Sequence, residues 1–370
     1  PESLSVDEAR TRMREFVKPI EGIERVAVRA ALGRVLADPV RARFPVPQHT
    51  NAAMDGYAIR GDCLPSSGYH AFTEIGVSLA GRPFEGSVGP DQCVRITTGA
   101  VVPEGADTVV MQEHVARDEN GILIDSDHKP GQNVRAAGED IAPGDEVLPV
   151  GHRITPADLG LIASLGLTEV GVRRRLRVAF FSTGDELRSL GEPLAPGMIY
   201  DSNRYTLWGM LTAMGAEVVD MGVVRDDEQA LVAAFREAGA IADVVITSGG
   251  VSVGEADYTR QVLAAVGEVA LWKVAMKPGR PMAFGRVGDA VFFGLPGNPV
   301  SVMVTFYQFV QPVLRQMVGA ATSLIPTVTA RTTSRLKKRP GRVEFQRGVL
   351  VRDEDGAWTV TPTGDQGSGI

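Results

Sequence analysis

The 370-residue chain is 44% hydrophobic and 22% charged, which is the balance of a globular protein. This length exceeds one ordinary hydrophobic core, so we expect several domains. A formal net charge of −7 argues against a general nucleic-acid binder, and no apolar run approaches the roughly 20 residues of a membrane-spanning helix. The amino end lacks the basic and apolar pattern of a secretion signal, so we expect a cytoplasmic protein without nucleic-acid or membrane partners.

Cysteine and histidine usage narrows the possible metal sites. Two cysteines, Cys63 and Cys93, are too few for a disulfide framework or a thiolate zinc site, and the five histidines show no metal-ligand spacing. Any bound metal is therefore expected to be held by carboxylates.

The first helix is predicted by a capping box, in which Ser5 is the cap and Glu8 follows three residues later; the helix should extend to about Val17. A second helix is predicted from the cap Thr155 to about Leu165. These helices belong to a mixed helical and β domain that we expect to be discontinuous, over residues 1–44 and 141–172.

Residues 45–140 separate the two parts of that domain. They contain short alternating apolar runs with frequent Gly and Pro, which predicts a strand-rich insert domain.

Residues 173–322 show apolar runs of strand length alternating with helical patterns, as a parallel α/β sheet requires. Four strands are expected, at Leu176–Phe181, Glu217–Val224, Asp243–Thr247 and Ala290–Gly294. Four helices are expected, at Tyr205–Met214, Asp227–Ala238, Tyr258–Val266 and Pro299–Val318. Ligands of such sheets bind beyond the carboxyl ends of the strands, so the loops after the strands are the candidate site.

Residues 323–370 predict a small β domain, because alternating patterns return and are broken by turn residues. The expected strands are Thr327–Thr332, Val343–Val351 and Trp358–Thr361. Three strands are few for a sheet, and we expect this domain to be incomplete.

The strongest candidate for chemistry is the loop after the strand ending at Thr247. It offers small residues and consecutive backbone N–H groups before a helix, which suits a phosphate, although glycines of this kind also serve as plain turns. The residues assigned to phosphate are Ser248, Gly249, Gly250, Ser252 and Gly254.

Acidic side chains follow three of the predicted strands. Glu186, Asp226 and Asp257 are expected to meet at one sheet edge, where carboxylates without His or Cys favour Mg²⁺ shared with substrate phosphates. Asp227 is open to two interpretations, a site acid or a helix cap.

Positive charge is expected opposite these acids. Lys273 and Lys277 are four residues apart and precede the helix breakers Pro278-Gly279, which favours a loop entering a cleft over an ordinary solvated face. Asn298 is the expected cap of the following helix, whose amino end could hold an anion. No nucleophile and base pair of the Ser-His-Asp kind is evident. The residues thus predict a Mg²⁺-dependent site for a phosphorylated, anionic small molecule.

Several motifs in order make the chain resemble a known family over essentially its whole length. They are Asn51-Ala52-Ala53-Met54-Asp55-Gly56-Tyr57-Ala58, Thr98-Gly99-Ala100, Gly138-Glu139-Asp140, Ser182-Thr183-Gly184-Asp185-Glu186-Leu187, Ser248-Gly249-Gly250-Val251-Ser252-Val253-Gly254, Lys277-Pro278-Gly279 and Leu295-Pro296-Gly297-Asn298-Pro299. The family is that of the molybdopterin molybdenumtransferases, MoeA in bacteria and the E domain of gephyrin in animals.

The resemblance implies a fold of four parts around a three-layer α/β/α, molybdopterin-binding-like sheet domain. It also implies that adenylylated molybdopterin is bound, that its pyrophosphate bond is cleaved with Mg²⁺ present, and that molybdate is inserted with release of AMP. By the matching motifs, Glu186, Asp226 and Asp257 would organise metal and pyrophosphate. Lys273 and Lys277 would compensate phosphate or molybdate charge.

Further residues gain roles only through this resemblance. Asp55, Thr98 and Asp140 match positions with functional roles in the family. Because molybdate is a tetrahedral dianion, cations and helix-end donors are its reasonable hosts, and we nominate Lys277, Ser301, Arg347 and Ser368.

The resemblance also implies partners. The family's homodimer places the second and fourth domains of one subunit against the sheet domain of the other, so the site would be shared between subunits. Molybdopterin adenylyltransferase and apo-molybdoenzymes are further expected partners. Two other functions remain open at this point, a molybdopterin adenylyltransferase and a non-catalytic dimeric scaffold.

Overall fold

The computed structural model describes residues 3–250, 262–321, 326–338 and 340–369. The chain divides into two compact units. The first comprises Pro1–Asp38, Val150–Pro156 and Glu169–Ile370, and the second comprises Pro39–Pro149 and Ala157–Thr168. No helix in the described ranges has the length and apolar content to cross a membrane.

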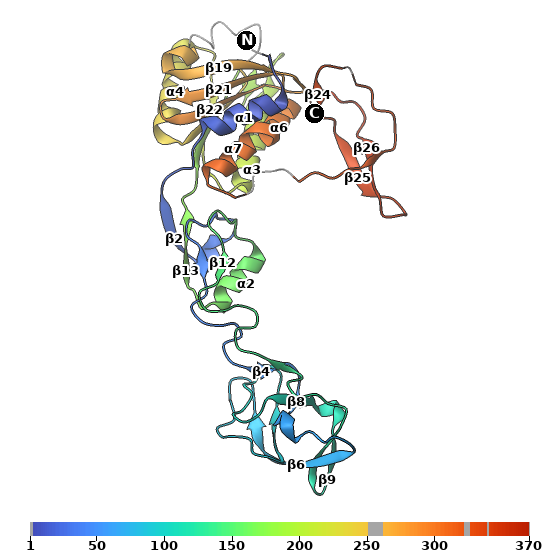
Figure 1. Cartoon of the computed structure of the whole chain (residues 1–370). Helices are drawn as coiled ribbons and strands as arrows, with labels where there is room; N and C mark the ends of the chain where they lie inside the picture. Colours follow the sequence, from blue (N-terminus) through green and yellow to red (C-terminus); the bar gives the residue numbers. More distant parts are fainter. Residues whose placement is uncertain (1–2, 251–261, 322–325, 339, 370) are drawn as a thin grey trace. The chain divides into compact units, whose positions relative to one another are not determined.

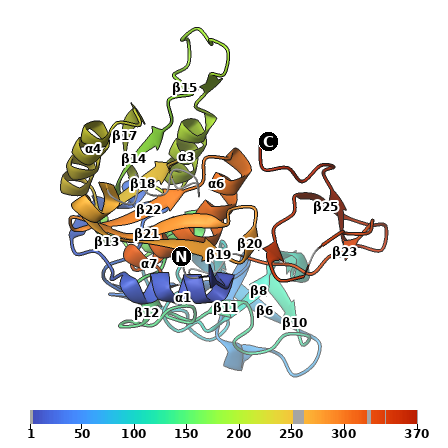
Figure 2. The same ribbon diagram turned by 90° about the horizontal axis from the view of Figure 1, so that it is seen from above.

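A mixed seven-stranded sheet organises the first unit (Figure 1). Its strands are, in spatial order, β1 (Ser3–Leu4), β19 (Gly267–Val274), β21 (Pro281–Val287), β22 (Ala290–Leu295), β18 (Val244–Ser248), β14 (Arg177–Thr183) and β17 (Glu217–Val224). Figure 2 shows the order from β19 to β17 from above. Neighbours from β22 to β17 are parallel, whereas β21 is antiparallel to both β19 and β22. The four predicted strands are confirmed, and they form the parallel half of the sheet.

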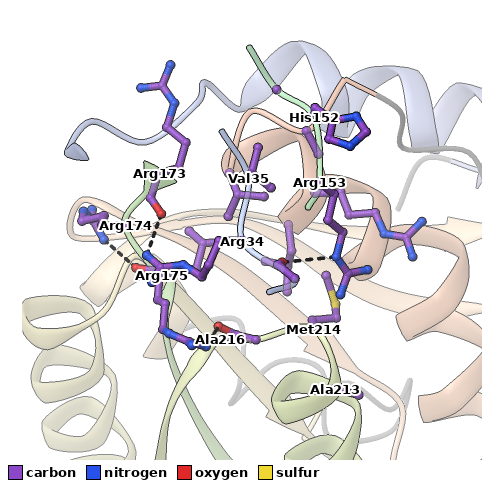
Figure 3. A pocket seen from close by; sticks show the side chains of 18 of the residues that line it. Arg34, Val35, His152, Arg153, Arg173, Arg174, Arg175, Ala213, Met214 and Ala216 are labelled. Carbon is purple, nitrogen blue, oxygen red and sulfur yellow. Dashed lines mark hydrogen bonds between the residues drawn. The ribbon is translucent and has the colours of Figure 1, made fainter. Parts of the chain in front are cut away.

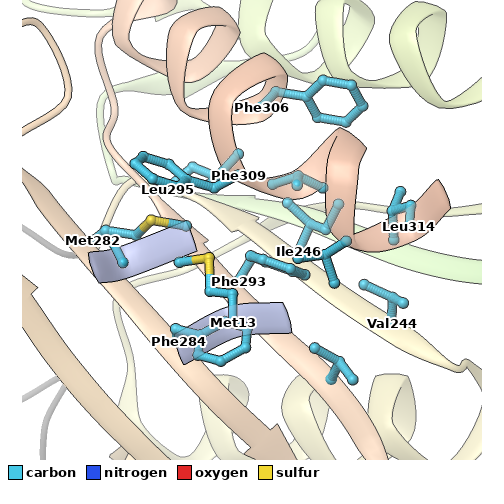
Figure 4. Packing of buried hydrophobic residues seen from close by; sticks show 14 of the residues in the cluster. Met13, Val244, Ile246, Met282, Phe284, Phe293, Leu295, Phe306, Phe309 and Leu314 are labelled. Atoms are coloured by element: carbon cyan, nitrogen blue, oxygen red, sulfur yellow. The ribbon is translucent and has the colours of Figure 1, made fainter. Parts of the chain in front are cut away.

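Helices cover both faces of this sheet. They are α1 (Val6–Phe16), α3 (Ser202–Ala213), α4 (Glu228–Ile241), a helical segment at 262–266, and a continuous helix made of α6 (Pro299–Thr305), a π-helical turn (Phe306–Val310) and α7 (Gln311–Met317). The helical segment belongs to the predicted helix Tyr258–Val266, whose first four residues fall outside the described residues. One buried core joins α1, α3, α6 and α7 to the sheet, as Met13, Phe293 and Phe309 show in Figure 4. A second core, with Phe181, Phe235 and Phe292, joins α4 to the other face. The unit therefore has three layers.

Two capping signals of the sequence are realised, whereas Asn298 stands at the cap position of α6 without a capping bond from its side chain. Ser5 and Glu8 exchange hydrogen bonds of 3.2 and 2.7 Å as a capping box at the start of α1. Asp227 accepts a bond of 2.9 Å from the Ala230 N–H and caps α4, so its interpretation as a helix cap is confirmed. Local residue patterns fix these helix starts because the cap side chain and the backbone N–H that donates to it are only three residues apart.

The prediction of a loop around Lys273 was wrong. Residues 267–274 and 281–287 are strands β19 and β21, which pair antiparallel, and Lys273 opposes Pro281 within that pair. Lys277 lies in a separate strand, β20 (Met276–Lys277). The sequence around Lys273 shows no clear alternation of apolar and polar residues. The hairpin is therefore evident only from the pairing of its two strands.

Smaller sheets complete the first unit. They are β2 (Ile23–Ala27) with β13 (Glu169–Arg173), β15 (Leu187–Arg188) with β16 (Ile199–Tyr200), β20 with β24 (Val343–Glu344), and β23 (Arg331–Thr332) with β26 (Trp358–Pro362) and β25 (Gly348–Arg352). The expected strand Val343–Val351 is thus two strands with different partners. Of the expected strand Thr327–Thr332, only the last two residues are paired.

The second unit is strand-rich, as predicted for the insert. Its main sheet has the order β8 (Thr108–Met111), β5 (Gly56–Ile59), β7 (Gln92–Ile96), β6 (Tyr69–Ser78), β10 (Gly121–Asp125) and β9 (Ala116–Asp118). Two-stranded ladders join β4 (Asn51–Ala52) to β11 (Val134–Arg135) and β3 (Val40–Arg41) to β12 (Glu146–Leu148). The helix α2 (Pro156–Ser164) occupies the predicted position.

Candidate functional site

The carboxyl ends of three neighbouring strands meet in the first unit. Ser182 at the end of β14 is in register with Ser248 at the end of β18, and their buried hydroxyls are 3.2 Å apart. The Gly249 N–H donates a bond of 3.1 Å to the carbonyl of Leu295, which ends β22. The strands thus fix the start of the candidate phosphate loop.

Gly249 and Gly250 both have left-handed backbones, with φ of 90° and 67°. A Cβ on Gly249 would lie 2.5 Å from the Thr183 carbonyl oxygen. A Cβ on Gly297, in the loop after β22, would lie 3.7 Å from the Gly249 Cα. At Gly249 a side chain is excluded by both conformation and space, and the loop after β22 comes within ordinary contact distance, so the loops after β14, β18 and β22 lie close together here.

Three polar side chains around this point carry buried oxygens with no hydrogen-bond partner among the described residues. They are the Thr183 Oγ1, the Asp201 Oδ2 and the Asn203 Oδ1. The Asn203 amide donates a bond of 2.6 Å to the Gly297 carbonyl, which ties α3 to the loop after β22. Buried polar groups are ordinarily satisfied, so these atoms mark a place suited to a polar ligand.

The predicted acids lie in loops at this edge. Glu186 follows β14 and Asp226 follows β17, and the two strands pair up to Thr183 and Val224. Both carboxylates are exposed. Asp257, Ser252 and Gly254 fall outside the described residues. Within the described ranges, no three His, Cys, Asp or Glu side chains are grouped closely enough to hold a metal ion.

The predicted molybdate residues occupy neighbouring segments at the start of α6. Ser301 is buried in the first turn of that helix. A Cβ on Gly279, two residues after Lys277, would lie 3.7 Å from the Ser301 carbonyl oxygen. The exposed Lys277 belongs to β20, and its carbonyl accepts a bond of 2.8 Å from the Phe345 N–H. The segment carrying Lys277 therefore packs close to α6.

The carboxyl-terminal segment reaches the same helix. The Ser368 carbonyl accepts a bond of 3.2 Å from the Val300 N–H. The Arg347 guanidinium holds this segment in place by donating bonds of 2.7 and 2.8 Å to the carbonyls of Gly367 and Asp365. The structure thus brings Arg347 and Ser368 towards Ser301, although they are far apart in sequence.

Lys273 is placed differently. Strand alternation puts Trp272 and Val274 in the α1 and α6 core, so Lys273 projects to the face of the sheet that carries Leu271. Nothing in the described contacts joins Lys273 to Lys277.

A second group of predicted residues lies in the strand-rich unit. Thr98 donates to one oxygen of Asp55 from both its backbone N, at 2.6 Å, and its Oγ1, at 2.7 Å. These two bonds hold the pKa of Asp55 below its usual value. Asp140 instead pairs with Arg135 at 2.6 Å, and Arg135 is opposite Asn51 in the β4 and β11 ladder.

Three residues at the sheet edge were not predicted as site residues. Thr183 lies inside a motif that the sequence already singled out. Asp201 could have been found as a helix cap, because it accepts a bond from the Arg204 N–H at 3.2 Å. Asn203 has no local signal, since its partner Gly297 is 94 residues away.

Comparison with known proteins covers the whole chain. Profiles match for the MoeA N-terminal region (domains I and II) at residues 4–166, a probable molybdopterin binding domain at 179–316, and the MoeA C-terminal region (domain IV) at 329–370. The molybdopterin molybdenumtransferase of Haemophilus influenzae is 46% identical over 99% of this chain and 90% of its own length. The molybdopterin molybdenumtransferase of a Nostoc species is 42% identical over 87% of this chain and 76% of its own length.

A solved structure extends this likeness to the fold. The molybdopterin biosynthesis MoeA protein of Pyrococcus horikoshii has a TM-score of 0.86 and 30% identity, covering 100% of this chain and 92% of that one. The match spans all the segments that carry the candidate site. The chain belongs to the MoeA family of molybdopterin molybdenumtransferases.

Proposed function

We propose that this protein catalyses molybdate insertion in molybdenum cofactor biosynthesis. Its substrates would be molybdate and adenylylated molybdopterin, whose pyrophosphate bond is cleaved with Mg²⁺ present and AMP released. Family membership supports the general reaction. The observation that carries the proposal is the meeting of three strand ends at Gly249, next to the unpartnered oxygens of Thr183 and Asn203.

This arrangement suits a pyrophosphate. The bare backbone at Gly249 and Gly250 lets phosphate oxygens come close to N–H groups, as anion-binding loops after strands do. The Thr183 hydroxyl can donate one hydrogen bond to a phosphate oxygen. The strands β14, β18 and β22 hold these groups in a fixed geometry before the ligand arrives, so little ordering is required on binding.

The acids supply the donor chemistry for Mg²⁺. Glu186 and Asp226 are exposed carboxylates that follow paired strand ends, and hard oxygen ligands of this kind fit the ion. We propose that they hold it together with Asp257 and substrate oxygens. When bound, Mg²⁺ would neutralise charge on the pyrophosphate as its bond breaks.

Molybdate would bind beside the start of α6. A tetrahedral dianion requires cations and N–H or O–H donors, and Lys277, Ser301, Arg347 and Ser368 offer both. Arg347 already uses two donors on backbone carbonyls, but a guanidinium has five. We assign Lys273 to charge compensation on the substrate.

We further propose a homodimer in which Asp55, Thr98 and Asp140 of one subunit complete the site of the other. Mixing an Asp55→Asn variant with an Asp226→Asn variant tests this arrangement. A shared site predicts recovered activity in the mixed dimer, because one of its two sites then contains no substitution. No recovery in a mixed dimer that has formed would contradict it.

AMP release tests the function itself. Purified protein mixed with adenylylated molybdopterin, Mg²⁺ and molybdate should release one AMP for each molybdenum inserted, and omission of molybdate or Mg²⁺ should lower the yield. Robust ATP consumption with molybdopterin alone would instead identify an adenylyltransferase. Absence of both activities in a folded dimer would leave a scaffold role.

A further inference from the structure

The first unit contains a cavity of about 630 Å³ at the amino end of β14 (Figure 3). Five separate segments line it, together with Pro326. The segments are Leu32–Val35, Gly151–Arg153, Arg173–Leu176, Thr212–Ala216 and parts of Leu314–Ala321. Six of the lining residues are arginines, namely Arg34, Arg153, Arg173, Arg174, Arg175 and Arg315, and we call this cavity the arginine pocket.

The positive charge of the arginine pocket is only partly compensated. Arg34 pairs with Glu24 at 2.5 Å, and Arg174 pairs with Asp243 at 2.7 Å. Neither acid lines the pocket, and no other aspartate or glutamate does. The described part of the chain offers no carboxylate within ion-pair distance of the other four arginines. Among the residues that the structure describes, these four guanidinium groups therefore form no ion pair.

Arg315 and Arg153 are like charges that act on each other in the arginine pocket. Arg315 is half-buried on α7, and burial together with the nearby Arg153 lowers the pKa of its guanidinium. The Arg153 Nε donates a bond of 3.3 Å to the Gly33 carbonyl, as Figure 3 shows. Partial burial of like charges opposes folding unless an anion compensates them.

Donors remain available on these side chains. Arg175 uses one nitrogen on the Gly215 carbonyl at 2.8 Å, and Arg153 uses its Nε. Each guanidinium has five N–H donors in a planar fork that matches phosphate oxygens. The remaining donors can therefore form bidentate bonds to a bound oxyanion.

The rest of the arginine pocket is apolar. Val35 and Leu314 are buried side chains in its wall, and Met214 and Val318 also line it. A volume of this size accommodates a small organic molecule rather than a single inorganic ion. Apolar walls beside unpaired arginines suit a ligand with an uncharged ring and a phosphate group.

The arginine pocket is separate from the candidate active site. It begins at Leu176, directly before β14, whereas Thr183 ends that strand. A strand of seven residues spans roughly 20 Å. A ligand here would thus be bound apart from the molybdate reaction.

We propose that the arginine pocket is a binding site for a phosphate-bearing small molecule of about nucleotide size. Its phosphate contacts Arg153, Arg175 and Arg315, and its ring packs against the apolar wall. Calorimetric titration of the full-length protein with AMP and with inorganic pyrophosphate tests this site. An Arg153→Gln/Arg315→Gln variant should lose one binding step per chain, or bind at least about tenfold more weakly, because charge-assisted hydrogen bonds are removed. AMP should bind the wild-type pocket more tightly than pyrophosphate.

An Arg236→Gln variant is the matched control, since Arg236 is exposed on α4 and does not line the pocket. It removes one positive charge from the same unit and should leave both titrations unchanged.

Thermal unfolding of the double variant should occur at or above the wild-type temperature, because a like-charge repulsion is relieved. Should the double variant fail to fold, the same titrations can be made with Arg153→Gln alone, because this substitution changes only an exposed side chain. Equal binding in the pocket variant and wild type, or equal losses in the control, would overturn the proposal. So would a changed oligomeric state, which would assign the arginines to a subunit contact.

Discussion

Thr98 donates two hydrogen bonds to a single carboxylate oxygen of Asp55, across 43 residues of sequence. The pair joins two turns that the family resemblance marks separately. It fixes the direction of one exposed carboxylate and favours its ionised form.

Replacing Thr98 tests that relationship. Thr98→Val removes the Oγ1 donor and keeps the backbone donor, so the pKa of Asp55 should rise towards its ordinary value. Because the folded-state pKa is lowered, the stabilisation from this carboxylate is present above the unfolded pKa and lost as pH falls through the folded pKa. In the variant, the free energy of unfolding should therefore depend less strongly on pH below about pH 4. Carbon NMR titration of the Asp55 carboxyl measures the pKa directly, and Thr98→Ser, which keeps the hydroxyl, should leave it low.

The adjacent acids Asp226 and Asp227 provide a matched pair. Asp226→Asn should lower kcat/KM for AMP release at least about tenfold, because an amide is a poorer ligand for Mg²⁺ than a carboxylate. Asp227→Asn should retain activity and stability, since asparagine caps helices as well as aspartate does. Steady-state assays across a range of Mg²⁺ concentrations would show the difference. Equal activity of the two variants would remove Asp226 from the proposed metal site.

Gly249 can be compared with a second left-handed glycine. Gly249→Ala introduces a Cβ at 2.5 Å from the Thr183 carbonyl, whereas the Cβ of Gly191→Ala meets nothing within 4 Å. Both residues have φ near 90°, so each alanine costs about 1–2 kcal/mol from conformation alone. Only Gly249→Ala should cost more than this, and it should also lower activity. Chemical unfolding of the two variants gives the comparison, and equal destabilisation would argue against the close approach.

The two cysteines should react very differently. Burial, with a smaller contribution from Glu74, raises the pKa of the Cys93 thiol to about 12, while Cys63 is only half-buried. Since the thiolate is the reactive form, a thiol reagent at pH 8 should modify Cys63 and spare Cys93 in the folded protein. Mass spectrometry after iodoacetamide treatment locates the label. Rapid labelling of Cys93 without denaturant would show that the core of the strand-rich unit opens readily.

The sequence by itself determined the features that depend on near neighbours. The capping box of Ser5 and Glu8 and the four parallel strands were predicted, and a helix cap was one of the two interpretations of Asp227. Caps act within three residues, and buried strands require continuous apolar runs. Ordered motifs were also enough to indicate the family.

Only the tertiary structure decided which distant residues meet. The pairing of β19 with β21 changed the expected surroundings of Lys273, and Asn203 reaches Gly297 only because α3 packs beside the loop after β22. The arginine pocket likewise collects charges from four segments, and none of those segments is unusual alone. Strand register and helix packing are set by the burial of apolar faces throughout the unit, so contacts of this kind leave no local signal.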